Sequence, residues 1–160
     1  MVDLKKIING PELFLIAGPC VIENEKTTFE IAEEIKYITE KLNIPFIFKA
    51  SYKKENRTKL NSFRGPGVKE GLITLKKIKK KLNLTITTDV HNVDDIKKVK
   101  DIIDIIQIPA FLCRQTDILI ASAKTKKYIN VKKGPFLSGE ACKFIIEKIK
   151  QSGNKKIIIT

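Results

Sequence analysis

The chain has 160 residues, of which 42% are hydrophobic and 31% are charged, and its formal net charge is +13. This length and apolar content predict one globular domain over residues 1–160, and no apolar run approaches the roughly 20 residues of a membrane span. The first ten residues lack the layout of a signal peptide, and the three cysteines include no C-x-x-C pair, so we expect a cytoplasmic protein without a disulfide framework.

Short apolar runs alternate with longer amphipathic segments along the chain. The runs predict buried strands at residues 13–17, 45–50, 84–90, 104–110, 128–132 and 155–160. Between them, apolar residues recur at intervals of three and four, which predicts helices over residues 27–42, 68–82, 93–102, 116–126 and 138–151. Strand followed by helix, five times over with a sixth strand at the end, predicts an α/β fold with a parallel sheet.

Polar and charged residues follow almost every predicted strand. In a (β/α)₈ barrel the loops at the carboxyl ends of many strands build the active site, whereas a doubly wound sheet concentrates its chemistry at one switch point. The first turn, AGPCVIE, also lacks the G-x-G-x-x-G of many doubly wound sheets. We therefore predict a partial (β/α)₈ barrel with five βα units plus a sixth strand, which is shorter than the roughly 250 residues of a full barrel.

Cations are densest between residues 48 and 67. Only three of the 31 cationic side chains are Arg, and two of them, Arg57 and Arg64, lie in this segment. Because the planar guanidinium matches phosphate or carboxylate with two hydrogen bonds, we interpret the segment as an anion-binding loop. The Lys clusters at residues 76–81 and 97–100 have helical spacing and no interleaved aromatic residues, which favours solvated helix faces. A basic nucleic-acid-binding module stays an alternative that rests on charge alone.

Six segments occur in an order and spacing that resemble one enzyme family. They are IAGPCVIE (16–23), FKASYKKENRTK (48–59), SFRGPG (62–67), TTDVH (87–91), IQIPAFLCRQTD (106–117) and INVKKGPF (129–136). Over nearly the whole chain, this set resembles the 3-deoxy-D-manno-octulosonate 8-phosphate synthases. The related 3-deoxy-arabino-heptulosonate 7-phosphate synthases share a similar GPC turn and are the alternative, but the uninterrupted KASYKKENR and PAFLCRQTD favour the octulosonate enzymes.

The resemblance implies an aldol-type condensation of phosphoenolpyruvate with D-arabinose 5-phosphate, in lipopolysaccharide sugar biosynthesis. In the family, C3 of phosphoenolpyruvate attacks the sugar aldehyde, water adds at C2, and the intermediate loses inorganic phosphate by C–O cleavage. The implied partners are these small molecules and further copies of the chain, since the family is tetrameric, with neither nucleic acid nor membrane. Clustered cations would offset the repulsion between the two anionic substrates.

The resemblance also implies roles for individual residues. The positions that match those around phosphoenolpyruvate are Lys49, Ser51, Lys54, Gln107 and Lys132, and those that match the sugar phosphate site are Asn56, Arg57, Thr58, Asp89 and Phe111. Of these, Lys49, Lys54, Asn56 and Asp89 are the expected catalytic set. Thr58 replaces the Ser that is more usual in the family and keeps the hydroxyl. Arg114 matches an arginine that reaches the sugar phosphate of a neighbouring subunit.

Cys20 matches the position that divides the family into a metal-dependent class with Cys and a metal-independent class with Asn. We therefore expect a divalent metal, zinc, iron or manganese, with Cys20 as one ligand. The family's other ligands come from strands beyond the sixth, and His91 does not match any of them. We expect Cys113 and Cys142 to be packing residues. The 160-residue chain alone is expected to associate and to show no turnover, so an inactive or split remnant of the synthase is a further alternative.

Overall fold

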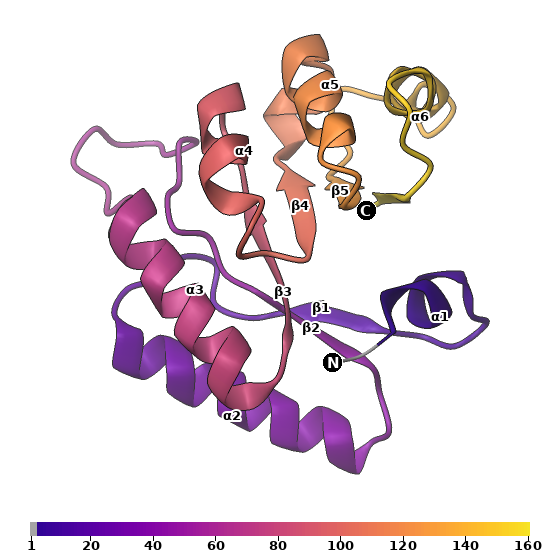
Figure 1. The fold of residues 1–160 in the computed structure, drawn as a ribbon. Helices are drawn as coiled ribbons and strands as arrows, with labels where there is room; N and C mark the ends of the chain where they lie inside the picture. Colours follow the sequence, from indigo (N-terminus) through magenta and orange to yellow (C-terminus); the bar gives the residue numbers. More distant parts are fainter. Residues whose placement is uncertain (1–2) are drawn as a thin grey trace. The chain divides into compact units, whose positions relative to one another are not determined.

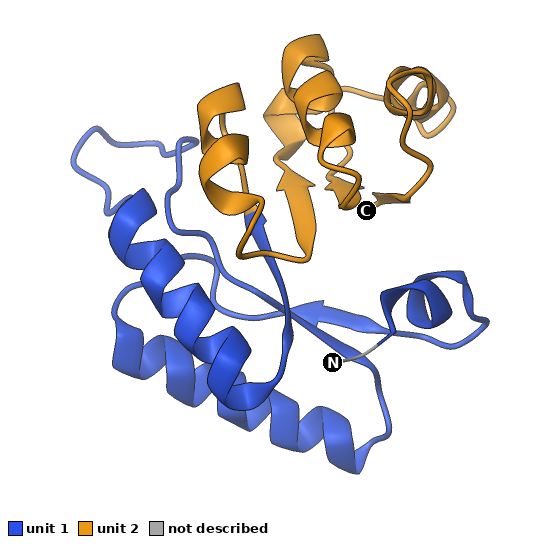
Figure 2. Cartoon of the chain, viewed as in Figure 1, with its two compact units in different colours: residues 1–88 blue, residues 89–160 orange. Residues whose placement is uncertain are grey.

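The computed structural model describes residues 3–160, and the chain divides into two compact units, residues 1–88 and residues 89–160 (Figure 2). In each unit, parallel strands alternate with helices (Figure 1). The chain is therefore an α/β protein with the strand and helix order of a partial (β/α)₈ barrel, as predicted. The assignment of residues 1–160 to a single domain stays a prediction.

From residue 3 onward, the first unit contains three helices and three parallel strands. In chain order they are α1 (Leu4–Asn9), β1 (Leu15–Ala17), α2 (Glu25–Lys41), β2 (Phe46–Lys49), α3 (Val68–Leu82) and β3 (Thr85–Asp89), whose last residue opens the second unit. Strand β2 lies between β1 and β3, with Ala17 opposite Phe48 and Lys49 opposite Thr87. Helices α2 and α3 run side by side (Figure 1). This arrangement brings the ends of the three strands to one edge of the sheet.

Asparagines set the helix boundaries of the first unit. The side chain of Asn24 caps α2 by accepting a hydrogen bond from the Thr27 amide at 2.8 Å. Asn43 and Asn83 follow α2 and α3 in the left-handed conformation, with φ of 54° and 52°. Asn tolerates this conformation better than most residues, so each helix can end and turn into the next strand within a few residues.

The second unit repeats the pattern with shorter helices. In chain order it contains α4 (Val93–Val99), β4 (Ile105–Ile108), the 3₁₀ helix η1 (Ala110–Leu112), α5 (Thr116–Lys124), β5 (Tyr128–Val131), α6 (Cys142–Gln151) and β6 (Ile157–Ile159). Strand β5 pairs in parallel with both β4 and β6, and Gln107 lies directly opposite Asn130. All four residues of β4 are buried, which fits its nearly continuous apolar sequence.

The predicted elements are present, with shifted ends and two additions, α1 and η1. Helix α1 was not predicted, although Leu4, Ile7 and Ile8 have helical spacing. It has six residues and buries none of them, and the Asp3 side chain caps it by accepting hydrogen bonds from two amides. The first strand begins at Leu15 rather than at Leu13, whose side chain is 80% exposed. The helix predicted over residues 93–102 ends at Val99.

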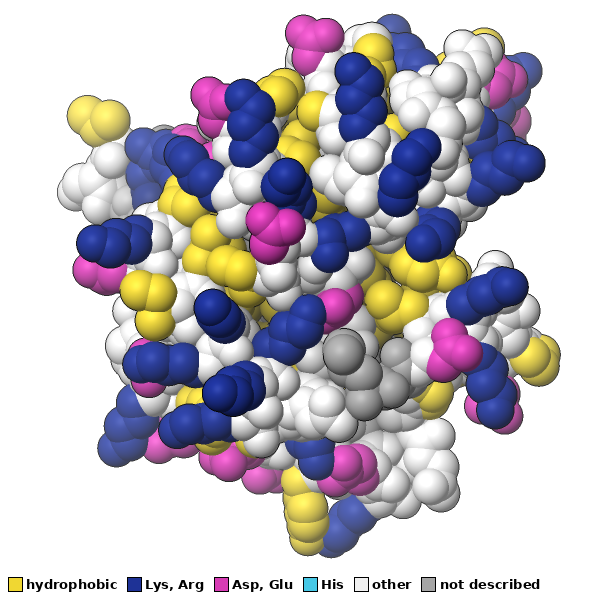
Figure 3. Space-filling view, in the orientation of Figure 1, with side chains coloured by type: hydrophobic (Ala, Val, Ile, Leu, Met, Phe, Trp, Pro, Cys, Tyr) yellow, Lys and Arg dark blue, Asp and Glu magenta, His cyan; other side chains and the backbone are white. Residues whose placement is uncertain are grey.

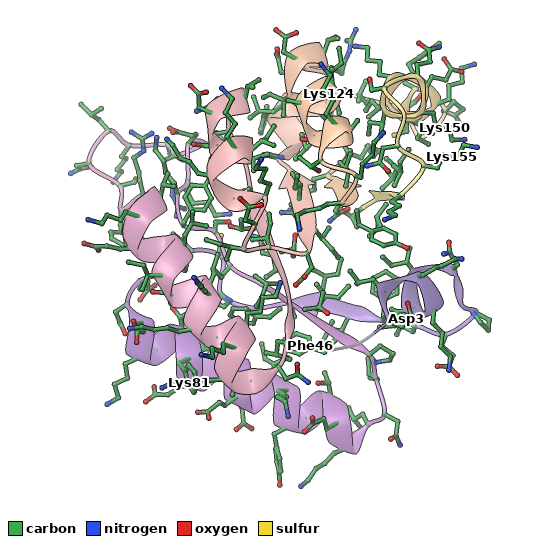
Figure 4. The ribbon with its side chains drawn as sticks, viewed as in Figure 1. Asp3, Phe46, Lys81, Lys124, Lys150 and Lys155 are labelled. Atoms are coloured by element: carbon green, nitrogen blue, oxygen red, sulfur yellow. The ribbon has the colours of Figure 1, made fainter. Side chains whose placement is uncertain are left out.

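Lysines gather in the last turns of the helices, where positive charge favours the negative end of the helix dipole. Lys81 lies in the last turn of α3, Lys124 in that of α5 and Lys150 in that of α6 (Figure 4). On the face shown in Figure 3, Lys and Arg side chains lie among Asp and Glu side chains. These placements support solvated helix faces for the Lys clusters. Within residues 3–160, no helix is long and apolar enough to cross a membrane.

Candidate functional site

The GPC turn after β1 packs against the end of β2. Gly18 has a φ of +148°, and a Cβ at this position would lie 2.1 Å from the carbonyl oxygen of Lys49. Only glycine combines this conformation with so close an approach of two backbones. Two residues later, the carbonyl of Cys20 accepts a hydrogen bond from Lys49 Nζ at 3.4 Å. The turn therefore contacts both the backbone and the side chain of a predicted catalytic lysine.

Lys49 and Ser51, both predicted to contact phosphoenolpyruvate, are hydrogen-bonded to each other. Lys49 Nζ donates to Ser51 Oγ at 2.8 Å, and the Ser51 side chain is fully buried. The Ser51 carbonyl accepts from the Ile22 amide at 3.0 Å, and Ser51 forms a parallel bridge with Val21. Because its neighbours fix Ser51, they also fix the position of the lysine ammonium at the end of β2.

The basic loop, residues 53–64, closes on itself at its base. The Lys54 amide donates to the Arg64 carbonyl at 2.8 Å, and Arg64 Nε donates to the Lys54 carbonyl at 3.1 Å. The Arg64 guanidinium and the Lys53 ammonium both pair with the carboxylate of Glu55. The Arg64 guanidinium therefore helps to hold the base of the loop together, and its interpretation as an anion-binding side chain stays a prediction.

The tip of the basic loop carries the residues that match the sugar phosphate site. Asn56, Arg57 and Thr58 are all exposed, whereas Lys54 is half-buried nearer the base. The Arg57 amide donates to the Glu55 carbonyl at 3.1 Å, which turns the chain at the tip. A dissolved anion can therefore reach the Arg57 guanidinium without any displacement of the loop base.

In the second unit, four side chains at the ends of the strands form a hydrogen-bonded row, which we call the polar row: Asp89, Gln107, Asn130 and Thr160. Gln107 Nε2 donates to Asp89 Oδ1 at 2.5 Å, and Asn130 Nδ2 donates to Gln107 Oε1 at 3.0 Å. Thr160 Oγ1 donates to Asn130 Oδ1 at 3.3 Å. Asp89, Gln107 and Asn130 are only 4%, 7% and 1% exposed. The structure thus joins two predicted site residues, Asp89 and Gln107, directly.

Asn130 and Thr160 were not predicted as site residues. The motif INVKKGPF drew attention to the lysines after the strand rather than to the amide within it. A usable signal was present, because one polar residue interrupts each of the buried apolar runs of β4 and β5. Buried polar groups are nearly always hydrogen-bonded, so two amides at matching positions of neighbouring strands predict a contact.

The other predicted residues of the second unit lie in the segments that follow β4 and β5, with Phe111 in η1. Phe111 is 58% exposed, and its ring centroid lies 6.1 Å from that of Phe136. Lys132 is exposed just after β5, where its amide donates to the Ile108 carbonyl at 3.0 Å. Arg114 precedes α5 and lines a pocket of about 310 Å³ together with Phe144 and Lys148 of α6. The polar row does not include these three side chains, Phe111, Lys132 and Arg114.

The described residues supply one candidate metal ligand, the exposed thiol of Cys20. Among residues 3–160, no three His, Cys, Asp or Glu side chains lie together as a metal site. His91 lies at the start of α4, where its amide donates to Asp95 Oδ2 at 3.2 Å and its Nδ1 is 3.6 Å from the same oxygen. These residues do not by themselves make a metal centre.

Known proteins match nearly the whole of this chain. The model of the DAHP synthetase I family matches residues 1–160. A protein of Koribacter versatilis (strain Ellin345) named 2-dehydro-3-deoxyphosphooctonate aldolase is 51% identical over 153 residues, which are 96% of this chain and 55% of that protein. Proteins of the same name from Geobacter sp. (strain M21) and Desulfatibacillum aliphaticivorans are each 50% identical, over 97% and 94% of this chain and 57% and 55% of their own lengths. The chain spans about half the length of these curated relatives, and it belongs to the DAHP synthetase I family.

Proposed function

We propose that the chain carries substrate-binding residues of a 2-dehydro-3-deoxyphosphooctonate aldolase, which condenses phosphoenolpyruvate with D-arabinose 5-phosphate. The observation that carries this proposal is the identity of about half of all positions to curated proteins of that name. An alignment over 153 of the 160 residues spans every predicted site residue, from Cys20 to Lys132. The aligned region therefore covers all the segments on which the assignment depends.

For phosphoenolpyruvate, the proposed ligands are the cations and amide at the strand ends. The ammonium group of Lys49 is held by Ser51, and Lys54 lies half-buried at the base of the basic loop, where its backbone amide is hydrogen-bonded. An ammonium group with restricted motion binds carboxylate or phosphate at a smaller entropic cost than a mobile one. Gln107 offers an uncharged donor for the same anion.

For the sugar phosphate, the proposed ligands lie at the exposed loop tip. Arg57 would bind the phosphate through two parallel N–H donors, while Asn56 and Thr58 would bind hydroxyl or phosphate oxygens. In the proposed reaction, C3 of phosphoenolpyruvate forms a bond to the sugar aldehyde carbon, water adds at C2, and the C–O bond to phosphate breaks. The cations on this chain would reduce the repulsion between the two substrates and align the reacting carbons.

We further propose that Cys20 is one ligand of a divalent metal, zinc, iron or manganese. A thiolate suits these metals, and the exposed sulfur at the end of β1 is accessible to an ion. When bound, such a metal would polarise the aldehyde or orient the water. Elemental analysis of the purified protein tests this: Cys20→Asn should lower the bound metal, and unchanged metal content would make Cys20 a structural residue.

A cytoplasmic homotetramer is the proposed setting, in which Arg114 would reach the sugar phosphate of a neighbouring subunit. The exposed position of Arg114 beside the pocket on α6 supports this role. Light scattering of the purified protein tests the assembly, and a monomer at working concentration would contradict it.

The test of the reaction is phosphate release from phosphoenolpyruvate plus arabinose 5-phosphate, measured with and without added divalent metal. Identification of the eight-carbon product by mass spectrometry would establish the activity. A parallel reaction with erythrose 4-phosphate distinguishes the heptulosonate alternative, because that enzyme would favour the four-carbon sugar. Binding of phosphoenolpyruvate without product formation would instead support an inactive or split form.

A further inference from the structure

The geometry points to Asn130 as a positioning residue that holds the side-chain amide of Gln107 in one orientation for an anionic substrate. This inference rests on the proposed function, and it adds a residue to which that function assigns no role. All the groups involved lie within the second unit, on neighbouring strand ends: Asp89, Gln107, Asn130 and Thr160.

The carboxylate of Asp89 determines the direction of the polar row. The Gln107 side chain turns its NH₂ group toward Asp89 Oδ1, which accepts, and its oxygen toward Asn130 Nδ2, which donates. Asn130 must then donate through Nδ2 to that oxygen, which leaves its own Oδ1 to accept from Thr160. Every donor in the row therefore points toward Asp89.

Asn130 supplies the second of two anchors on the Gln107 amide. With Asp89 alone, the amide could rotate about its single hydrogen bond, and the buried Oε1 would lack a partner. With both anchors, the plane of the amide is fixed. Nε2 carries two hydrogens, one directed at Asp89, and the fixed plane determines where the second points. We assign this second hydrogen to an oxygen of the bound anion, phosphoenolpyruvate in the proposed reaction.

The register of the sheet makes Asn the fitting residue at position 130. Asn130 lies directly opposite Gln107 in the β4–β5 pair, and its side chain is 1% exposed. A residue here needs one donor for Gln107 and one acceptor for Thr160, and a neutral amide provides both without a charge. Aspartate would place a second acceptor against Gln107 Oε1, and alanine would leave that oxygen buried without its partner.

Asn154 is a matched control within the same unit. It is 3% exposed, its Nδ2 donates to the Lys127 carbonyl at 2.8 Å, and its Oδ1 accepts from the Lys156 amide at 2.9 Å. It is therefore a buried asparagine with two hydrogen bonds, like Asn130, but its partners are backbone groups outside the polar row. Asn154→Ala should cost comparable stability without altering the amide of Gln107.

The experiment combines side-chain amide NMR of the 160-residue protein with titration of phosphoenolpyruvate. In the parent, the two Gln107 NH₂ protons should have widely separated shifts and exchange slowly with water, because Asp89 holds one of them. Asn130→Ala should bring the two Gln107 chemical shifts closer together and speed the exchange of these protons with water. It should also weaken phosphoenolpyruvate binding about tenfold, as expected for a lost hydrogen bond. Asn154→Ala should change neither.

Each outcome decides a different part of the inference. An unchanged Gln107 amide spectrum in Asn130→Ala overturns the positioning role. A changed spectrum with unchanged phosphoenolpyruvate affinity overturns the link to the substrate. If the parent binds no phosphoenolpyruvate, the proposed substrate is wrong, and the spectra still decide whether Asn130 orients Gln107. If Asn130→Ala does not fold, Asn130→Ser, which keeps a donor of smaller size, should give an intermediate amide signal, and a parent-like signal would contradict the role.

Discussion

The basic loop of the first unit and the polar row of the second unit place predicted site residues in opposite environments. In the first unit, Asn56, Arg57 and Thr58 lie exposed on a loop held at its base by the pairing of Arg64 with Glu55. In the second unit, Asp89 and Gln107 are buried at strand ends and hydrogen-bonded. Buried polar groups with fixed partners are oriented before a ligand arrives, whereas exposed cations pay an entropic cost when they bind it. The loop is therefore suited to attracting a phosphate, and the row to orienting an anion.

The largest loss of stability is expected in the GPC turn of the first unit, where the backbones of Gly18 and Lys49 lie in close contact. Gly18→Ala would place a Cβ at 2.1 Å from the Lys49 carbonyl oxygen, at a φ of +148° that alanine rarely adopts. The steric collision and the backbone strain together should lower the free energy of unfolding by about 4 kcal/mol. Urea unfolding followed by circular dichroism measures this loss.

Gly139→Ala is the control, because a Cβ there meets nothing within 4 Å. Its unfolding midpoint should stay within the error of the parent value. If Gly18→Ala were equally harmless, the turn would have room to move away from β2, and the backbone contact would not position Lys49.

The second prediction concerns the direction of the polar row. Asn130→Asp puts a carboxyl opposite Gln107 Oε1, with the Asp89 carboxylate on the other side of the same amide. Burial and the nearby acceptors should raise the pKa of the new carboxyl above its unfolded value of about 3.9. A raised folded pKa means that stability is retained below the unfolded pKa and is lost as the pH rises through the folded pKa.

At low pH, the protonated carboxyl can donate to Gln107 as the amide of Asn130 does. At pH 8, the variant should be less stable than the parent by about 3 kcal/mol, the cost of a buried charge without a partner. Urea unfolding at several pH values checks this, with Asn130→Ala as a control whose loss should not depend on pH. A pH-independent loss in Asn130→Asp would show that the direction of the row has no energetic consequence.

Much of the fold follows from the sequence, because strands buried on both faces are apolar runs and amphipathic helices have a period near 3.6 residues. The ends of elements are harder, since they depend on local contacts. Helix α6 begins at Cys142 rather than at 138, after a turn in which Ser138 Oγ accepts from the Ala141 amide at 3.2 Å. In the sequence, a serine before an apolar-periodic segment is typical of a helix start. It therefore does not show whether the helix begins directly after the serine or after a further turn.

The site was predictable in its residue types and not in its contacts. The resemblance identified Gln107 and Asp89, but only the register of β4 against β5 places Asn130 beside Gln107. Charge pattern also did not indicate the pairing of Arg64 with Glu55, because Glu55 lies nine positions away and the pairing needs the closed loop. Sequence shows which groups are available, and the fold decides which of them neutralise one another.

The third prediction tests the exposed loop of the first unit. Arg57→Lys should weaken arabinose 5-phosphate binding about tenfold and leave phosphoenolpyruvate affinity almost unchanged, because a point charge cannot reproduce two parallel hydrogen bonds. Calorimetric titration with each ligand separates the two effects. Lys59→Ala, on the same exposed loop, is the control and should change both affinities only slightly. Equal effects of Arg57→Lys on both ligands would remove Arg57 from its assigned role.

The smallest effect is expected for a carboxylate that is exposed rather than buried. Asp94 lies in the first turn of α4, where a hydrogen bond and the nearby charge of Lys97, 2.8 Å away, lower the pKa of its carboxyl. A lowered folded pKa means that the stabilisation is present above the unfolded pKa and is lost as the pH falls through the folded one. Because both side chains are more than 70% exposed, water and salt should screen most of this interaction.

Asp94→Asn should therefore leave the urea midpoint at pH 7 nearly unchanged, in contrast to the large loss in Asn130→Asp. Carbon-detected NMR titration should show the Asp94 pKa below its ordinary value at low salt and closer to it in 1 M salt. Lys97→Met should raise that pKa at low salt, because it removes the hydrogen bond and the charge together. If neither salt nor Lys97→Met changed the Asp94 pKa, the helix dipole, and not the ion pair, would stabilise this carboxylate. The difference in stability effect between Asp94→Asn and Asn130→Asp would then result from the electrostatics of the backbone rather than from the exposure of Asp94 to solvent.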